Sequence, residues 1–316
     1  MLVEEELGEI SPKKDMLLTI GVFDGVHKGH KYLISQLKEQ AKQQDLLSGV
    51  VTFRQHPLKI LAPQTELPYL TSLEEKVQLL KNEGVDIVIS LSFTQELAKL
   101  SASQFVSLVK KHLRMRGLVI GPDFALGRNR EGNADTLIKL GQEMGFSVTV
   151  VPPVKINGEV VSSTAIRKAL ANGDIKRVTK LIGRPFSIQG LVTTGVGRGS
   201  GLGFPTANLE IDSTQTLLPE GVYATWTFID GKAYQSLTNV GKRPTFGSNG
   251  RTMETHILNF NGNLYGHEIK IDIVERLRGE KRFDTIDELK KQIAEDIKQG
   301  KVILNSQKNH QIDTIM

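Results

Sequence analysis

The stretch Gly21-Val22-Phe23-Asp24-Gly25-Val26-His27-Lys28-Gly29-His30 lies between an apolar run, residues 16–20, and an amphipathic pattern that predicts a helix. Its three glycines let the backbone approach a ligand closely. The exposed N–H groups at the start of a helix favour an anion. We therefore expect a strand–turn–helix unit that binds nucleotide phosphates.

Two of the seven histidines, His27 and His30, lie in this turn. A spacing of three residues places both on one face of the first helical turn. Imidazoles at that position can stabilise charge on the α-phosphate of ATP as pyrophosphate leaves. The pattern thus favours nucleotidyl transfer over γ-phosphoryl transfer. Two alternatives stay open, a turn with two surface histidines and half of a metal site.

The hydrophobic content and the fraction of charged residues are typical of an ordinary soluble protein. A chain of 316 residues predicts two domains. The absence of cysteine excludes disulfides, thiolate metal sites and cysteine nucleophiles. Residues 1–15 are acidic and lack an apolar core of signal-peptide length, and no apolar run reaches about 18 residues. We expect a cytoplasmic protein without a membrane partner.

The formal net charge of +5 does not by itself predict binding of nucleic acid. The charge is modest for this length, and anionic nucleotides explain it equally well. The densest basic cluster, residues 110–116, lies at the end of a predicted helix, where cations complement the helix dipole. We expect no nucleic-acid partner.

The first half of the chain alternates short apolar runs with helical patterns, which is typical of a parallel α/β sheet. The predicted strands are residues 17–22, 49–53, 86–92, 117–121 and 147–151. This half therefore looks like a Rossmann-like nucleotide-binding domain. It has neither a Gly-x-Gly-x-x-Gly after the first strand nor a P-loop motif. The periodicity changes at Gly183, so we predict domains at 1–182 and 183–316.

The second half is predicted to be mainly β. Residues alternate in polarity along 222–228 and 269–273, which predicts half-buried strands. Turns rich in Gly and Asn suggest a small antiparallel barrel. Thr285 and Glu288 predict a capping box that opens a closing helix, and Gly300 is predicted to end it. Its apolar face would be Ile286, Leu289, Ile293 and Ile297.

Three further segments of the first half carry polar groups near predicted strand or helix ends. His56 and Asp123 each follow a strand, at the sheet edge where open α/β folds bind ligands. Ser162-Ser163-Thr164 starts a helix, and Arg167 closes its first turn. Hydroxyls and a guanidinium there suit phosphate oxygens, although an ordinary N-cap and a surface arginine are the plainer interpretation.

The second half contains Gly199-Ser200-Gly201-Leu202-Gly203-Phe204-Pro205-Thr206-Ala207-Asn208, a run too rich in glycine for a central strand. Its Thr206 and Asn208 are hard oxygen ligands of the type that suits Mg²⁺. Residues 239–245 are predicted to form a second polar turn. Glu254 and His256 would share one face of a strand, and Glu254 could take a proton from a substrate hydroxyl or be a solvent-facing acid.

Taken in order over residues 17–300, these motifs resemble the bacterial bifunctional riboflavin kinase/FMN adenylyltransferase (FAD synthetase) family. The resemblance implies an N-terminal adenylyltransferase domain and a C-terminal Greek-key barrel that is a riboflavin kinase. It implies ATP and Mg²⁺, with riboflavin, FMN and FAD as the flavin partners. Nothing in the sequence indicates an oligomeric state.

Carried over by position, the resemblance implies five groups of site residues. Adenylyl transfer would be stabilised by His27, His30 and Arg167. ATP would contact Gly21, Phe23, Asp24, Gly29, Ser163, Thr164 and Gly203. The flavin would contact His56, Asp123 and Arg243, Mg²⁺ would be held by Thr206 and Asn208, and Glu254 would be the base that activates the ribityl hydroxyl.

The chain departs from the family pattern at Ser200, Asn259, Ala165 and Gln55, where an arginine, an aspartate, an arginine and a proline are usual. Ser200 matters most, because a cation is lost near the kinase phosphates. Two other functions stay open, an adenylyltransferase with a weak or flavin-sensing kinase domain, and a flavin-responsive regulator that binds RNA.

Overall fold

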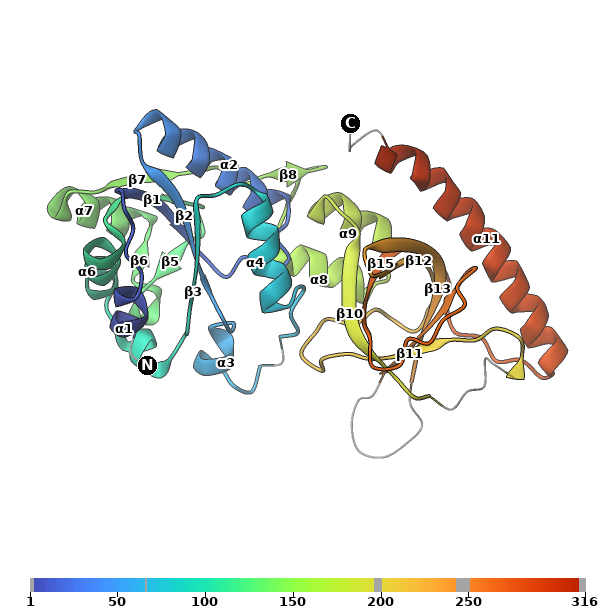
Figure 1. Ribbon diagram of the computed structural model, residues 1–316. Coiled ribbons are helices and arrows are strands. Elements are labelled where there is room, and N and C mark those ends of the chain that lie inside the picture. The colour runs from blue at the N-terminus through green and yellow to red at the C-terminus, as the bar shows by residue number, and fades with distance from the viewer. Residues whose placement is uncertain (1–2, 66, 196–200, 243–250, 313–316) are drawn as a thin grey trace. The chain divides into compact units, whose positions relative to one another are not determined.

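The computed structural model describes residues 3–65, 67–195, 201–242 and 251–312 (Figure 1). The chain forms two compact units, residues 1–163 and 164–316. Each unit has its own sheet and core, so each is described by itself.

The first unit is built on a sheet of five parallel strands in the order β3-β2-β1-β4-β7. The strands are β1 (Met16–Ile20), β2 (Leu47–Phe53), β3 (Ile87–Leu91), β4 (Met115–Ile120) and β7 (Ser147–Val150). All five predicted strands are confirmed. The central strand β1 is buried along its whole length, and its carboxyl end leads directly into the glycine-rich turn.

Helices cover both faces of this sheet, which explains why its central strands are apolar on both sides. Leu18 packs with α6, whereas Leu17 packs with α2 and α4. The helices of the unit are α1 (Val3–Gly8), α2 (Lys28–Gln43), α3 (Leu58–Leu61), α4 (Leu73–Asn82), α5 (Gln95–Lys99), α6 (Ala102–Leu113) and α7 (Ala134–Met144). Short strand pairs join β5 (Ala125–Leu126) to β6 (Gly132–Asn133) and β8 (Lys155–Ile156) to β9 (Glu159–Val160).

The second unit is a closed antiparallel barrel in the order β10-β11-β14-β13-β12-β15, as predicted. Its strands are β10 (Phe186–Thr193), β11 (Ala207–Glu210), β12 (Gly221–Ile229), β13 (Lys232–Lys242), β14 (Arg251–Ile257) and β15 (Glu268–Arg278). Helix α8 (Ser163–Ala171) begins at the division between the units, and α9 (Ile175–Ile182) packs on β10 and β15. The long helix α11 (Ile286–Ile312) lies along the outside of the barrel, against β12 and β13 (Figure 1).

The interior of the barrel is lined in part by hydroxyls. Thr225, Ser236, Thr238 and Thr255 form a chain of buried hydrogen bonds across β12, β13 and β14, with oxygen–oxygen distances of 2.8 to 2.9 Å. The opposite face of β12, including Trp226, packs on Leu304 of α11. The predicted half-buried strand is therefore wrong for β12, because its outward face is covered by a helix distant in the sequence.

Three further predictions of secondary structure are wrong in whole or in part. Helix α11 does not end at Gly300 but continues to Ile312, because Leu304, one turn beyond the glycine, packs with Trp226 of β12. The glycine-rich run is not a strand over residues 201–206, as predicted, but its end is one, since β11 begins at Ala207 and pairs on both sides. Asn239 to Lys242 belongs to β13 rather than to a turn, and residues 243–250 lie outside the described residues.

Candidate active sites

The glycine-rich turn places the two histidines against one another. His27 is the N-cap of α2, and its Nδ1 accepts a hydrogen bond of 3.3 Å from the His30 backbone N–H. The two rings stack with 3.6 Å between their centroids, and the edge of Phe23 meets His30 at 5.1 Å. A Cβ at Gly29 would lie 3.1 Å from the His27 ring, so the glycine permits this arrangement.

Both imidazoles are uncharged at neutral pH. Burial lowers the pKa of His27 to about 4. Burial, and then the neighbouring His27 and Lys76, hold the pKa of His30 well below its usual value. Because Nδ1 of His27 accepts a hydrogen bond, its proton is assigned to Nε2. A neutral N–H donor is thus available for a phosphate oxygen.

Asp24 holds the turn in place. Its carboxylate accepts hydrogen bonds from the backbone N–H groups of Leu70, at 3.0 Å, and Thr71, at 3.2 Å. Ser163 Oγ donates to the Asp24 carbonyl oxygen at 2.9 Å. Gly21, Phe23, Asp24 and Ser163 therefore lie around the histidine pair. Thr164 and Arg167 belong to the second compact unit, and their predicted roles stay predictions.

A cavity of about 570 Å³ opens beside Gly21 in the first unit. His56 and Asp123 both line it, as predicted from their positions after two strands. The other walls are mostly apolar and include Phe53, Phe93 and Phe124. Its mostly apolar lining, with a few polar groups, suits an aromatic ring system with polar substituents.

Arg130 also lines this cavity and was not predicted. Its Nη2 donates to the Asp123 carbonyl oxygen at 3.2 Å. It lies in the short 3-10 helix of residues 128–130, after a two-residue strand that no periodicity reveals. Its guanidinium places a permanent positive charge beside a cavity that is otherwise largely apolar.

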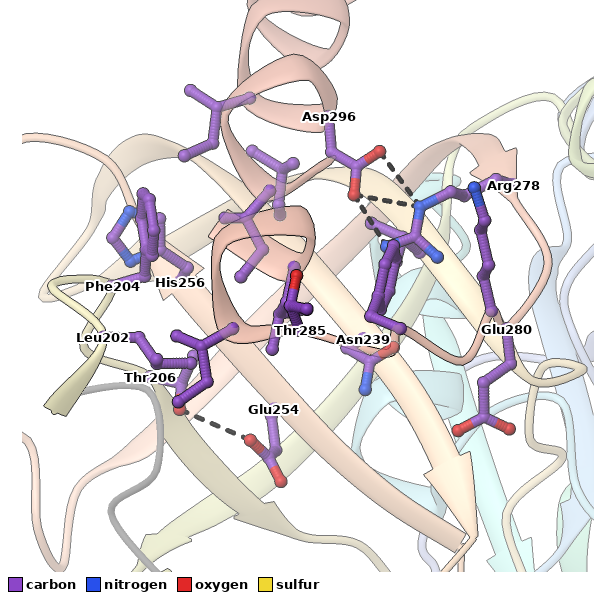
Figure 2. Close-up of a pocket in the computed structure, with 18 of the residues that line it drawn as sticks. Leu202, Phe204, Thr206, Asn239, Glu254, His256, Arg278, Glu280, Thr285 and Asp296 are labelled. Carbon is purple, nitrogen blue, oxygen red and sulfur yellow. Dashed lines mark hydrogen bonds and ion pairs between the residues drawn. The ribbon is translucent and has the colours of Figure 1, made fainter. Parts of the chain in front are cut away.

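In the second unit, three polar side chains lie in a row on the outer face of the barrel. Glu254 on β14 is directly opposite Asn208 on β11 and Asn239 on β13. Thr206 Oγ1 donates to Glu254 Oε2 at 3.4 Å (Figure 2). Asn239 was not predicted as a site residue, because the sequence pattern predicts a turn there. The register of β13 on β14 brings it next to Glu254.

A cavity of about 620 Å³ lies between this row and the first turns of α11. Its polar wall includes Thr206, Glu254 and Asn239 (Figure 2). Its apolar wall includes Leu289 and Ile293 of α11. The helix is tied to β15 by Arg278, whose Nε and Nη2 contact the Asp296 carboxylate at 3.0 and 2.8 Å. The predicted apolar face of the closing helix therefore lines a cavity.

The oxygen donors of this row fit a hard divalent cation. A carboxylate, a hydroxyl and an amide are ligands that Mg²⁺ accepts, with water and phosphates completing its shell. Among the described residues, no group of three His, Asp or Glu side chains could hold a metal. Gly203 has a φ of 88°, which glycine adopts readily. Arg243 and Ser200 lie outside the described residues.

The basic cluster at residues 110–116 is largely paired within the unit. Lys111 contacts Glu4 at 2.9 Å, and Arg114 and Arg116 contact the carboxylate of Asp15 at 2.8 and 2.6 Å. These ion pairs reduce the positive field that a nucleic-acid site needs. Within the described residues, no helix is long and apolar enough to cross a membrane.

Comparison with known proteins also divides the chain into two parts. Residues 9–165 match the FAD synthetase family model, and residues 182–304 match the riboflavin kinase model. Proteins named bifunctional riboflavin kinase/FMN adenylyltransferase are 38% identical in Escherichia coli K12, covering 90% of this chain and 92% of the relative, and 34% identical in Bacillus subtilis, covering 89% and 90%. The predicted boundary after residue 182 stays a prediction.

A solved structure is similar over nearly the whole chain. The crystal structure named macrolide-efflux protein from Streptococcus pneumoniae is 30% identical, with a TM-score of 0.87, and covers 93% of this chain and 96% of that one.

Proposed function

Because this chain belongs to the bifunctional riboflavin kinase/FMN adenylyltransferase family, we propose that the His27–His30 turn adenylylates FMN and that Glu254 activates riboflavin for phosphorylation. The family reactions are riboflavin plus ATP to FMN plus ADP, and FMN plus ATP to FAD plus pyrophosphate. The observation that supports this division is that each unit has its own polar cluster beside its own cavity of several hundred cubic ångströms.

Adenylyl transfer needs no general base in this proposal. A phosphate oxygen of FMN attacks the α-phosphorus of ATP, and the bond to the bridging β-phosphate oxygen breaks, so its electron pair leaves with pyrophosphate. The FMN phosphate is already an anion at neutral pH. Uncharged imidazoles that donate N–H groups to the phosphates therefore suffice, which fits the lowered pKa values of His27 and His30.

The flavin and the triphosphate approach the histidines from different elements in this proposal. The isoalloxazine ring enters the cavity lined by His56 and Asp123. Gly21, Gly29 and Phe23 shape the ATP pocket, and the N-terminus of α8 contributes the hydroxyls of Ser163 and Thr164. Arg167 on the same helix would stabilise charge on the phosphates.

Kinase chemistry at Glu254 starts from a neutral alcohol. Glu254 accepts the proton of the ribityl 5′-hydroxyl, the oxygen attacks the γ-phosphorus, and ADP leaves with the electron pair of the broken bond. Thr206 and Asn208 would hold Mg²⁺, which neutralises charge on the phosphates when bound. Gly203 would lie against ATP and Arg243 against the flavin. Both reactions consume ATP, so we place the protein in the cytoplasm.

Gly195→Ala is expected to lower kinase activity selectively. A Cβ at this position would lie 2.0 Å from Nδ2 of Asn208, so the Asn208 amide must leave its present position in the row. We expect at least about a tenfold loss of FMN formation, typical of a displaced metal ligand or its support. The rate of FAD formation from FMN is the control and stays at the wild-type value. Equal losses in both reactions would contradict the assignment of Asn208.

Product analysis by chromatography tests the proposal as a whole. The purified protein is supplied with riboflavin, ATP and Mg²⁺, and in parallel with FMN, ATP and Mg²⁺. We expect FMN followed by FAD in the first reaction and FAD with pyrophosphate in the second, both stopped by a chelator. If FAD forms from FMN but riboflavin is not phosphorylated, a flavin-sensing barrel is favoured. If neither reaction yields a product, the proposal is overturned.

A further inference from the structure

Lys76 is a buried lysine that the proposed chemistry does not yet use. It lies on α4 with 5% of its surface exposed. Its Nζ donates to the Phe53 carbonyl oxygen at 2.7 Å, and this is its one hydrogen bond among the described residues. Within the same residues it forms no ion pair. An ammonium has three donors, so two are left without a protein partner.

The position of this ammonium connects it to the adenylyl-transfer site. Phe53 ends β2 at the carboxyl edge of the sheet, next to β1, which leads into the histidine turn. Asp24 of that turn is close enough to favour the charge of Lys76, and Lys76 in turn opposes protonation of His30. Lys76 therefore contributes to the field at the histidine pair from a helix some 45 residues away in the sequence.

A buried ammonium without a carboxylate partner is costly to the fold. Proteins usually avoid this arrangement or pair the charge. Here burial lowers the pKa of Lys76 to about 8, against the effect of Asp24. The Asp24 carboxylate accepts hydrogen bonds from Leu70 and Thr71, and its negative charge favours the charged form of Lys76. The positive charge is thus only partly offset until an anion arrives.

We propose that Lys76 is a positioning residue of the adenylyl-transfer site, whose buried charge attracts the ATP triphosphate to His27 and His30. The inference rests on the proposed role of the histidine turn. The ammonium lies in a low-dielectric environment, where its attraction for a polyanion is stronger than in water. After burial and the neighbouring His27, it also opposes protonation of His30, so that both imidazoles remain neutral donors.

The proposal predicts a pH dependence with a definite sign. The titratable groups that interact with Lys76 are Asp24 from the turn and His30 from α2. Arg54 follows β2 and is exposed, and β3 carries no titratable side chain. In the free enzyme Lys76 is charged below pH 8 and loses its proton above it. The phosphates stay ionised throughout, so kcat/KM for ATP in FAD formation should fall as pH rises from 8 to 9.5.

The test compares Lys76→Gln, Lys76→Met and the control Lys81→Gln in the full chain. Lys81 lies on the same helix and is exposed. With FMN and ATP as substrates, we expect both Lys76 variants to lose about tenfold or more in kcat/KM for ATP at pH 7 and to lose the decline above pH 8. Lys81→Gln should match the wild type. If Lys76→Gln kept the wild-type kcat/KM and still showed the decline above pH 8, the proposal would be overturned.

A purely structural role predicts different results. If Lys76 only tethers α4 to β2, glutamine, which retains a donor for Phe53, should restore activity that methionine loses, and Lys76→Met should melt below the wild type. We expect equal losses in both variants and a melting temperature of Lys76→Met at or above the wild-type value, because a buried charge that is only partly offset is removed. Absence of FAD formation by the wild type itself would instead refute the proposed function.

Discussion

His27→Asn is expected to lower kcat for FAD formation from FMN and ATP by about 10²–10³-fold, the usual loss when one donor to developing charge is removed. Asparagine is a good N-cap, so the start of α2 should survive while the imidazole is lost. His30→Asn should have a similar effect, since the two rings stack at 3.6 Å. The measurement is initial-rate kinetics of FAD and pyrophosphate formation.

Two controls make this result specific. FMN formation from riboflavin should keep its wild-type rate in both variants, because that reaction is assigned to the other unit. His112→Asn replaces a histidine of the same unit that contacts Glu4, at 3.4 Å, and should form FAD normally. A loss below threefold in His27→Asn, or an equal loss in His112→Asn, would contradict the assigned role of the turn.

The parallel sheet could be predicted from sequence because its signals are local. Each strand is a short apolar run, since helices bury both faces of the sheet, and the predicted and observed bounds of β1 and β4 differ by at most two residues. The signals fail where an element is covered by another element that is distant in the sequence. β12 alternates as a half-buried strand does, yet α11 covers its outer face. Gly300 resembles a helix end, but the helix continues through it to Leu304, which packs with Trp226.

The same distinction applies to the candidate sites. His27 and His30 are found from sequence because one turn of helix holds both. The sequence does not reveal the roles of Asn239, Lys76 and Gly195, since their neighbours come from other strands or helices. Asn239 meets Glu254 through the register of β13 on β14, and Lys76 reaches the end of β2 from α4. Contacts of this kind leave no period or motif in the chain.

Glu254→Gln should lower kcat for FMN formation by about 10²–10⁴-fold, the range for removal of a general base. Glutamine has the same size and keeps an oxygen that can accept the hydrogen bond from Thr206, 3.4 Å away. It cannot take the proton of the ribityl hydroxyl. Initial rates with riboflavin, ATP and Mg²⁺ measure the loss, and FAD formation from FMN should be unchanged.

Binding of riboflavin separates the loss of a base from the loss of the cavity. The apolar wall from Leu289 and Ile293 is untouched by Glu254→Gln, so riboflavin affinity should stay within about threefold of the wild type, a change below 1 kcal/mol. Glu210→Gln, an exposed carboxylate on β11, is the matched control and should retain full kinase activity. If Glu254→Gln retained its rate but bound riboflavin poorly, Glu254 would be a binding residue, and proton removal would belong to another group beside Asn208 and Asn239.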